Sequence, residues 1–181
     1  EKVKLKDITI GGIGDENKSM TFTKEVPLYD SNFIVTFGAE DISATPSQVS
    51  TVTVSMENTM GVCALEGVIT LPEGLSFVKN AEDEYCTAAE RVASLHYITT
   101  TKVGNAGNQV KFLVDAGTPV DIVGKSGPIF TFDVKGDASL AKNALIKITD
   151  IYGSTIRGDL KNIDDITINV TNPDVDAIAT A

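Results

Sequence analysis

A single histidine and a scatter of carboxylates are the side chains of this sequence that could perform acid–base or nucleophilic chemistry. His96 is the one imidazole among 181 residues, so any Ser-His-Asp hydrolase would have to use it. It lies in Ser-Leu-His-Tyr at residues 94–97, which lacks the sharp strand-to-helix turn that exposes a catalytic serine. We therefore predict that His96 is a structural or surface residue.

Paired acids are the other route to catalysis, because glycoside hydrolysis needs two carboxyl groups flanking the scissile bond. Four acids in or beside strand-like segments could supply such a pair: Glu66, Glu73, Asp115 and Asp133. The chain carries 25 Asp and Glu residues, so solvated strand faces and turns account for these four without catalysis. We predict that the protein is not an enzyme.

Cofactor-binding motifs are weak in this sequence. The acidic loop residues Glu82, Asp83 and Glu84 could offer oxygen ligands to calcium, but they do not alternate with other residues as in a ready-made calcium loop. Calcium stays open as an alternative, and we predict no other cofactor. The Gly-Gly-Ile-Gly run at 11–14 lacks the helix and the lysine of a phosphate-binding loop, and it is interpreted as a linker-type turn.

Cys63 and Cys86 are the two thiols, and they are too far apart in sequence for a Cys-x-x-Cys chelating or redox pair. Cys63 is in phase with Leu65 and Ile69, which predicts a small buried hydrophobic residue. A disulfide between the two cysteines is the alternative, and it would need the oxidising environment of a secreted protein. The sequence leaves both interpretations open.

Charge and composition exclude several classes of partner. The formal net charge is −10 and the carboxylates are spread along the chain, which opposes binding to nucleic acid or to anionic membranes. The chain begins at Glu1 without an apolar leader and has no apolar run of about 18 residues that could span a bilayer. We expect a soluble, trimmed chain that does not insert into membranes.

Aromatic residues bear on carbohydrate binding, since exposed rings usually lie on sugar faces. The chain has no Trp, and its four tyrosines are dispersed at Tyr29, Tyr85, Tyr97 and Tyr152. An extended cellulose-like platform is therefore not expected, whereas a small glycan pocket stays open.

Period-2 alternation of apolar and polar residues is the main structural signal. It predicts strands over residues 3–10, 20–26, 33–37, 49–56, 62–71, 75–78, 92–101, 110–115, 129–135, 145–151 and 166–171. The predicted inward residues are Val54, Leu65, Ile69, Phe112, Phe130, Phe132, Ile148 and Ile168. One wet and one dry face per strand predicts an all-β fold, a two-sheet antiparallel β-sandwich.

Turn residues separate these segments. Pro72 and Gly74 form a turn between two strands, with Gly74 able to adopt positive φ. Residues 104–108 predict a hairpin loop, residues 124–128 a turn before a strand, and residues 80–91 a loop with at most a short helix. The predicted organisation is an N-terminal pair of strands or extension packing on the sandwich over 1–31, the sandwich over 32–172, and a linker over 173–181.

An ordered set of turn motifs then carries a family resemblance. Cys-Ala-Leu-Glu-Gly at 63–67 leads to Leu-Pro-Glu-Gly-Leu at 71–75, followed by Arg91 and His96, Ser-Gly-Pro-Ile-Phe at 126–130 and Lys-Gly-Asp-Ala at 135–138. In this order the chain resembles, over about residues 33–171, the cohesin-like modules of Bacteroidetes surface and secreted proteins. These modules share the fold of cohesins and cellulose-binding modules.

The resemblance implies a jelly-roll-like sandwich of about nine core strands, with an N-terminal hairpin or extension. It also implies an exported protein, at the cell surface, in the periplasm or secreted, that is used for binding or for spacing other domains. We predict a non-catalytic binding or scaffolding module with a protein partner, dockerin-like proteins among the candidates. A carbohydrate-binding module of a polysaccharide-degrading system and an inert spacer are the alternatives.

Small, uncharged side chains on outward strand positions are the predicted partner face. They form two rows: Thr51, Thr53 and Ser55 on one strand, and Thr167, Asn169 and Thr171 on another. Such rows could lie flat against a partner. The alternative is that threonine is simply favoured on exposed strands.

Overall fold

The computed structural model describes residues 2–4, 25–27 and 33–175, and the chain divides into two units, Glu1–Asn32 and Phe33–Ala181. In the first unit, β1 (Lys2–Lys4) pairs with β2 (Glu25–Pro27) in antiparallel fashion. The predicted packing of residues 1–31 on the sandwich lies outside the described residues. So do most of the strands predicted over 3–10 and 20–26 and most of the linker predicted over 173–181.

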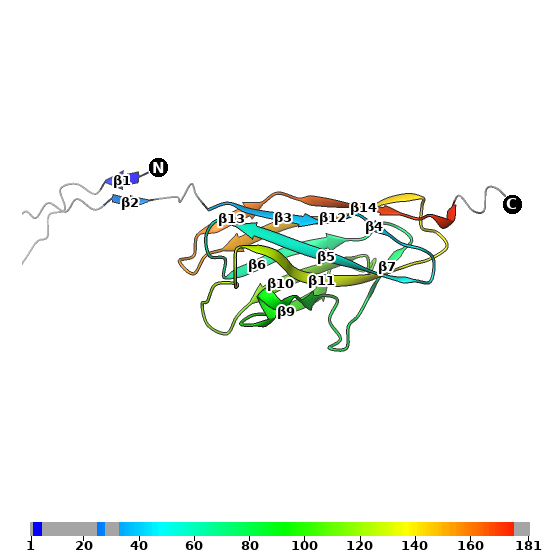
Figure 1. The fold of residues 1–181 in the computed structure, drawn as a ribbon, viewed down its shortest axis with the longest axis horizontal. Helices are drawn as coiled ribbons and strands as arrows, with labels where there is room; N and C mark the ends of the chain where they lie inside the picture. Colours follow the sequence, from blue (N-terminus) through cyan, green and yellow to red (C-terminus); the bar gives the residue numbers. More distant parts are fainter. Residues whose placement is uncertain (1, 5–24, 28–32, 176–181) are drawn as a thin grey trace, which may run out of the picture. The chain divides into compact units, whose positions relative to one another are not determined.

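The second unit consists of two β-sheets that lie face to face (Figure 1). The seven-stranded sheet has the order β4 (Ile42–Ser43), β14 (Ile166–Thr171), β12 (Asn143–Ser154), β6 (Ala64–Thr70), β10 (Gln109–Asp115) and β9 (Tyr97–Lys102), with β13 (Leu160–Ile163) also paired to β12. The five-stranded sheet has the order β3 (Val35–Ala39), β5 (Val49–Asn58), β11 (Ser126–Gly136) and β7 (Leu75–Val78), with β8 (Thr87–Ala88) paired to β11. The predicted two-sheet β-sandwich is confirmed.

The core lies between the two sheets and contains all the inward residues that alternation predicts. Each of them is at most 2% exposed: Val54, Leu65, Ile69, Phe112, Phe130, Phe132, Ile148 and Ile168. Phe112 of β10 and Phe130 of β11 join the sheets, with ring centroids 4.8 Å apart. Gly67 of β6 lies opposite Phe112 of β10. A Cβ on residue 67 would be 2.7 Å from the Phe112 ring, so only glycine leaves room for the ring.

The predicted turns are present. Gly74 has φ +83°, and a side chain there would collide with the backbone of Leu140, because an added Cβ would lie 2.4 Å from the Leu140 Cα. The Gly74 carbonyl accepts a hydrogen bond from the Asp137 amide at 2.9 Å. Residues 104–108 connect the antiparallel strands β9 and β10 as a hairpin. Sequence chemistry therefore placed these chain reversals correctly.

Three features depart from the sequence prediction. Residues 92–93 belong to the helix α1 (Glu90–Ala93) instead of a strand, and β9 begins only at Tyr97. The short strands β4, β8 and β13 were not predicted, since two to four residues are too few to show a period. Ile129 is buried beside Phe130, because the pairing of β11 with β5 shifts register between Pro128 and Phe130 and turns an extra residue inward.

Within the described residues, no helix has the length and apolar composition needed to cross a lipid bilayer.

Truncation of Phe130 tests the core. Phe130→Ala should lower the free energy of unfolding by about 3–5 kcal/mol, because it empties a site enclosed by both sheets. Thr131→Ala, at the adjacent outward position of β11, is the matched control and should change it by about 0.5 kcal/mol or less. Chemical denaturation monitored by circular dichroism gives both values, and equal effects of the two changes would contradict this packing.

Candidate functional site

His96 is buried, with 5% of its surface exposed, and it serves the fold. Its Nε2 lies 3.1 Å from the carbonyl oxygens of both Cys63 and Val120, so Nε2 carries the proton and joins the β6 entry to the loop after β10. Nδ1 has no hydrogen-bond partner within the described chain. Burial and two backbone carbonyl partners are the placement of a structural histidine.

Each of the four candidate acids has its own placement in the fold. Glu66 lies on the outer face of the seven-stranded sheet and forms an ion pair with Lys111 at 2.8 Å. Asp133 belongs to the five-stranded sheet and accepts a hydrogen bond from Thr51 at 2.6 Å. Asp115 accepts from the next backbone amide at 2.7 Å, and Glu73 is exposed. The sandwich core separates Glu66 from Asp133.

Two carboxylates of the acidic loop, those of Asp83 and Glu84, bind other groups of the protein. Asp83 pairs with Lys79 at 2.7 Å, and this bond raises the pKa of the Lys79 ammonium. Glu84 accepts hydrogen bonds from the hydroxyl and the backbone amide of Thr100, the latter at 2.8 Å. Across residues 2–4, 25–27 and 33–175, no three His, Cys, Asp or Glu side chains gather as a metal site.

Arg91 organises one end of the sandwich, a role that the sequence did not reveal beyond its place in the family motif. Its guanidinium donates five hydrogen bonds, all to oxygen atoms of the chain: Val123 O at 2.7 Å, Met56 O at 2.8 Å, Asn58 Oδ1 at 3.0 Å, and Gly124 O and Gly127 O at 3.1 Å. Burial lowers the pKa of Arg91. The side chain thereby ties α1 to the end of β5, the loop before β11 and the start of β11.

Both cysteines are free thiols, so the disulfide alternative is not realised. The predicted burial of Cys63 is wrong in detail. Cys63, expected to be buried, is half-buried with its Sγ 3.7 Å from Ser154 Oγ, because it precedes β6 and lies where that strand starts. Cys86, at the end of the acidic loop, is 1% exposed, since the loop folds back beside β11. Burial raises the pKa of the Cys86 thiol.

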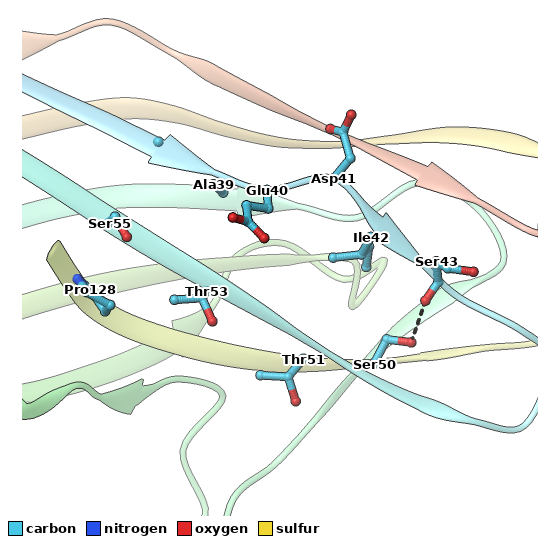
Figure 2. A pocket seen from close by; sticks show the side chains of 11 residues that line it. Ala39, Glu40, Asp41, Ile42, Ser43, Ser50, Thr51, Thr53, Ser55 and Pro128 are labelled. Atoms are coloured by element: carbon cyan, nitrogen blue, oxygen red, sulfur yellow. Dashed lines mark hydrogen bonds between the residues drawn. The ribbon is translucent and has the colours of Figure 1, made fainter.

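The two predicted polar rows lie on different sheets. Thr51, Thr53 and Ser55 line a polar groove on β5, which we call the β5 groove; Figure 2 shows it between β5 and the segment that connects β3 to β4. Its volume is about 830 Å³. Its remaining lining comprises Gly38, Ala39, Glu40, Asp41, Ile42, Ser43, Ser50 and Pro128.

The second row belongs to β14, where Thr167, Asn169 and Thr171 are all exposed. Asn169 is joined to the rim of the β5 groove, because its backbone amide and side-chain amide donate to the Asp41 carboxylate at 2.9 to 3.0 Å. These bonds lower the pKa of Asp41. The structure therefore brings Asn169, but not the whole second row, into contact with a residue that lines the groove.

A second surface, which sequence reasoning missed, is apolar. Leu113, Tyr152 and Leu160 are 39%, 39% and 70% exposed on β10, β12 and β13, and with Ala64 they line a hollow of about 480 Å³. We call this the apolar patch. Glu66 faces both Leu113 and Tyr152 across the sheet, so the patch runs over four neighbouring strands. The available signal was a large apolar residue at an outward position, such as Leu113.

A β-bulge is the reason that Tyr152 points outward. Two residues of β12, Asp150 and Ile151, lie opposite Gly67 alone, and Asp150 adopts φ +51°. The bulge shifts the alternation by one residue, so Ile151 is buried while Tyr152 is exposed. An unbroken period from Ile148 would have placed Tyr152 in the core.

Comparison with known proteins identifies the fold. A non-cellulosomal cohesin from the archaeon Archaeoglobus fulgidus matches with a TM-score of 0.60 and 15% identity, over 80% of this chain and 96% of that one. A chain of a type I cohesin–dockerin complex from Clostridium thermocellum matches with a TM-score of 0.62 and 10% identity, over 81% and 99%. The cohesin module of a Clostridium perfringens family 33 glycoside hydrolase has a TM-score of 0.62 and 10% identity, over 77% and 97%.

No protein-family model matches this chain, and no curated protein matches it. At identities this low, the likeness to solved structures concerns the fold alone. The chain has a cohesin-like β-sandwich fold, as the order of its turn motifs predicted.

The Arg91 network is testable with the chain's two arginines. Arg91→Lys should lower the free energy of unfolding by about 2 kcal/mol or more, because an ammonium has three donors and leaves part of the oxygen cluster unpaired. Arg157→Lys, at an exposed hairpin position, is the matched control and should be neutral. Urea denaturation of both variants measures the difference, and a neutral Arg91→Lys would show that water replaces the guanidinium without loss.

The Cys86 thiol should resist modification in the folded protein. Burial and a raised pKa both suppress the reactive thiolate. In a Cys63→Ser background, we expect no reaction with a thiol reagent under native conditions and complete reaction in denaturant. Rapid labelling of the folded Cys63→Ser variant would show that the loop around Cys86 opens readily.

Proposed function

We propose that this chain is a non-catalytic protein–protein interaction module of the cohesin type and that its apolar patch binds a dockerin-like protein. The exposure of Leu113, Tyr152 and Leu160 on β10, β12 and β13 of one sheet is the observation that carries the proposal. One solved structure of the same fold comes from a cohesin–dockerin complex, which supports a dockerin-like protein as the occupant.

The composition of the patch suits a protein interface. Contiguous exposed apolar side chains typically mark interaction surfaces, and tyrosine is enriched at the centres of interfaces. Glu66 lies between Leu113 and Tyr152, and its ion pair with Lys111 at 2.8 Å supplies polar groups of both signs within the patch. A partner that places apolar side chains over Tyr152 and Leu113 would therefore also meet the paired Glu66 carboxylate.

The sheet gives the patch a rigid base. Leu113 and Tyr152 both lie opposite Glu66 in the ladder formed by β10, β6 and β12, so their spacing is fixed by backbone pairing. The underlying residues Phe112 and Ile151 are fully buried. Such pre-organisation reduces the entropy that binding would otherwise cost.

Carbohydrate binding is the second candidate function, and the β5 groove is the observation that favours it. Its lining offers the hydroxyl groups of Thr51, Thr53 and Ser55 together with the Glu40 carboxylate (Figure 2). Sugar hydroxyls could form hydrogen bonds there. The lining contains no aromatic side chain to stack on a sugar ring, so we place this candidate behind protein binding.

The cellular setting belongs to the same proposal. We propose an exported protein, at the cell surface, in the periplasm or secreted, as in the Bacteroidetes surface and secreted proteins that the sequence resembles. The module would attach or space other domains there. An inert spacer would need neither the apolar patch nor the β5 groove, which is why we propose a binding role.

Binding to a panel of purified dockerins tests the proposal. The wild-type chain should retain at least one dockerin, and Leu113→Lys should weaken that binding about tenfold or more by placing a charge at the centre of the patch. Thr53→Lys and Thr167→Lys are matched controls on the two polar rows and should bind like the wild type. Thermal melts should be unchanged for all three variants.

Other outcomes would redirect the assignment. Loss of binding with Thr53→Lys and Thr167→Lys but not with Leu113→Lys would move the partner face to the threonine rows. Retention of no dockerin together with clear retention on a glycan array would favour the carbohydrate-binding candidate. Binding to neither would leave the spacer.

A further inference from the structure

The hairpin loop between β12 and β13 contains the tripeptide Arg157-Gly158-Asp159. The fold and the proposed function make no use of it. All five residues from Ile156 to Leu160 are exposed, so the tripeptide is displayed at the surface and not merely present in the sequence.

The loop has a defined backbone conformation. The Gly158 amide donates to the Thr155 carbonyl at 2.9 Å, and the Thr155 amide donates to the Asp159 carbonyl at 3.0 Å. Gly158 has φ +85°, a left-handed conformation that side chains resist. A β-turn followed by a left-handed glycine is a common way to close a hairpin.

Thr155 holds the loop from inside. Its hydroxyl is buried, accepts hydrogen bonds from the amides of Arg157 and Asp159 at 3.3 and 3.2 Å, and donates to Asp159 Oδ2 at 3.1 Å. One oxygen of the Asp159 carboxylate is thus fixed by the fold. Arg157 and Asp159 are both exposed. Within the described chain, Oδ1 of Asp159 and the guanidinium of Arg157 have no hydrogen-bond or ion-pair partner.

We propose that this loop is a ligand for a receptor that holds a divalent cation beside an acidic pocket. The free oxygen of Asp159 would complete the coordination shell of the cation, since Mg²⁺ and similar hard cations prefer carboxylate oxygen. The Arg157 guanidinium would form a two-pronged ion pair with an acid of the pocket. Gly158 has no side chain between these two groups and lets the receptor approach the backbone closely.

An apolar flank and pre-organisation strengthen this assignment. Ile156, before the tripeptide, is 54% exposed, so a receptor that binds the charged groups would also bury apolar surface. The hydrogen bonds of Thr155 fix the loop before binding, which lowers the entropic cost of association. This partner differs from a dockerin-like protein in requiring a cation and in reading the loop instead of the sheet face.

Binding of the full chain to a purified integrin ectodomain, used as the cation-holding probe receptor, tests the proposal. Surface plasmon resonance in Mn²⁺ or Mg²⁺ should show saturable binding that is abolished by EDTA and competed by a soluble Arg-Gly-Asp peptide. Asp159→Glu keeps the charge but moves the carboxylate by one methylene, and it should weaken binding about 30-fold or more.

Matched variants separate this site from the apolar patch. Arg157→Ala should also weaken binding, whereas Leu113→Lys should bind the ectodomain like the wild type and lose only the dockerin. Circular dichroism melts should be unchanged for Arg157→Ala and shifted only slightly for Asp159→Glu, which moves the carboxylate that accepts from Thr155. Absence of cation-dependent binding by the wild type, or equal binding by Asp159→Glu, would overturn the proposal and leave the dockerin assignment untouched.

Discussion

The contact between Phe112 and Phe130 sets the relation between the two sheets on which the other features depend. The rings lie 4.8 Å apart, and the missing side chain of Gly67 gives Phe112 its space. Because side chains alternate along each strand, fixing Phe112 inward fixes its neighbour Leu113 outward. The buried core and the exposed apolar patch therefore both follow from the register of β10. A one-residue shift of that strand would turn Leu113 inward and Phe112 outward.

Arg91 adds a polar constraint to this apolar one. Backbone carbonyls at the end of a sheet need donors, and at the junction of α1, β5 and β11 the chain satisfies Met56, Gly124 and Gly127 with a single guanidinium. His96 does comparable work nearby through the carbonyls of Cys63 and Val120. Arg91 and His96 therefore both hold irregular segments in place.

Alternation predicted the strands that are long enough to show a period, and it placed Val54, Phe112 and Ile168 in the core. It failed where the backbone departs from a regular ladder. Ile129 and Tyr152 follow or occupy bulges, whose position depends on pairing partners that a single segment does not contain. The apolar patch and the Arg91 network join residues distant in sequence, so only the folded chain brings them together. The buried setting of Cys86 likewise depends on how its loop returns to β11.

The bulge in β12 divides that strand into two parts with different neighbours. The first part, up to Ile148, pairs with β14, and the part from Ile151 pairs with β13. Both parts contribute to the core, through Ile148 and Ile151, and the second also leads into a hairpin whose tip is exposed. Insertions, deletions or substitutions at the tip of this hairpin would leave Phe112 and Phe130 undisturbed, since hairpin tips tolerate such changes. The molecule thereby separates its packed core from a hairpin tip, where the surface can change without repacking the interior.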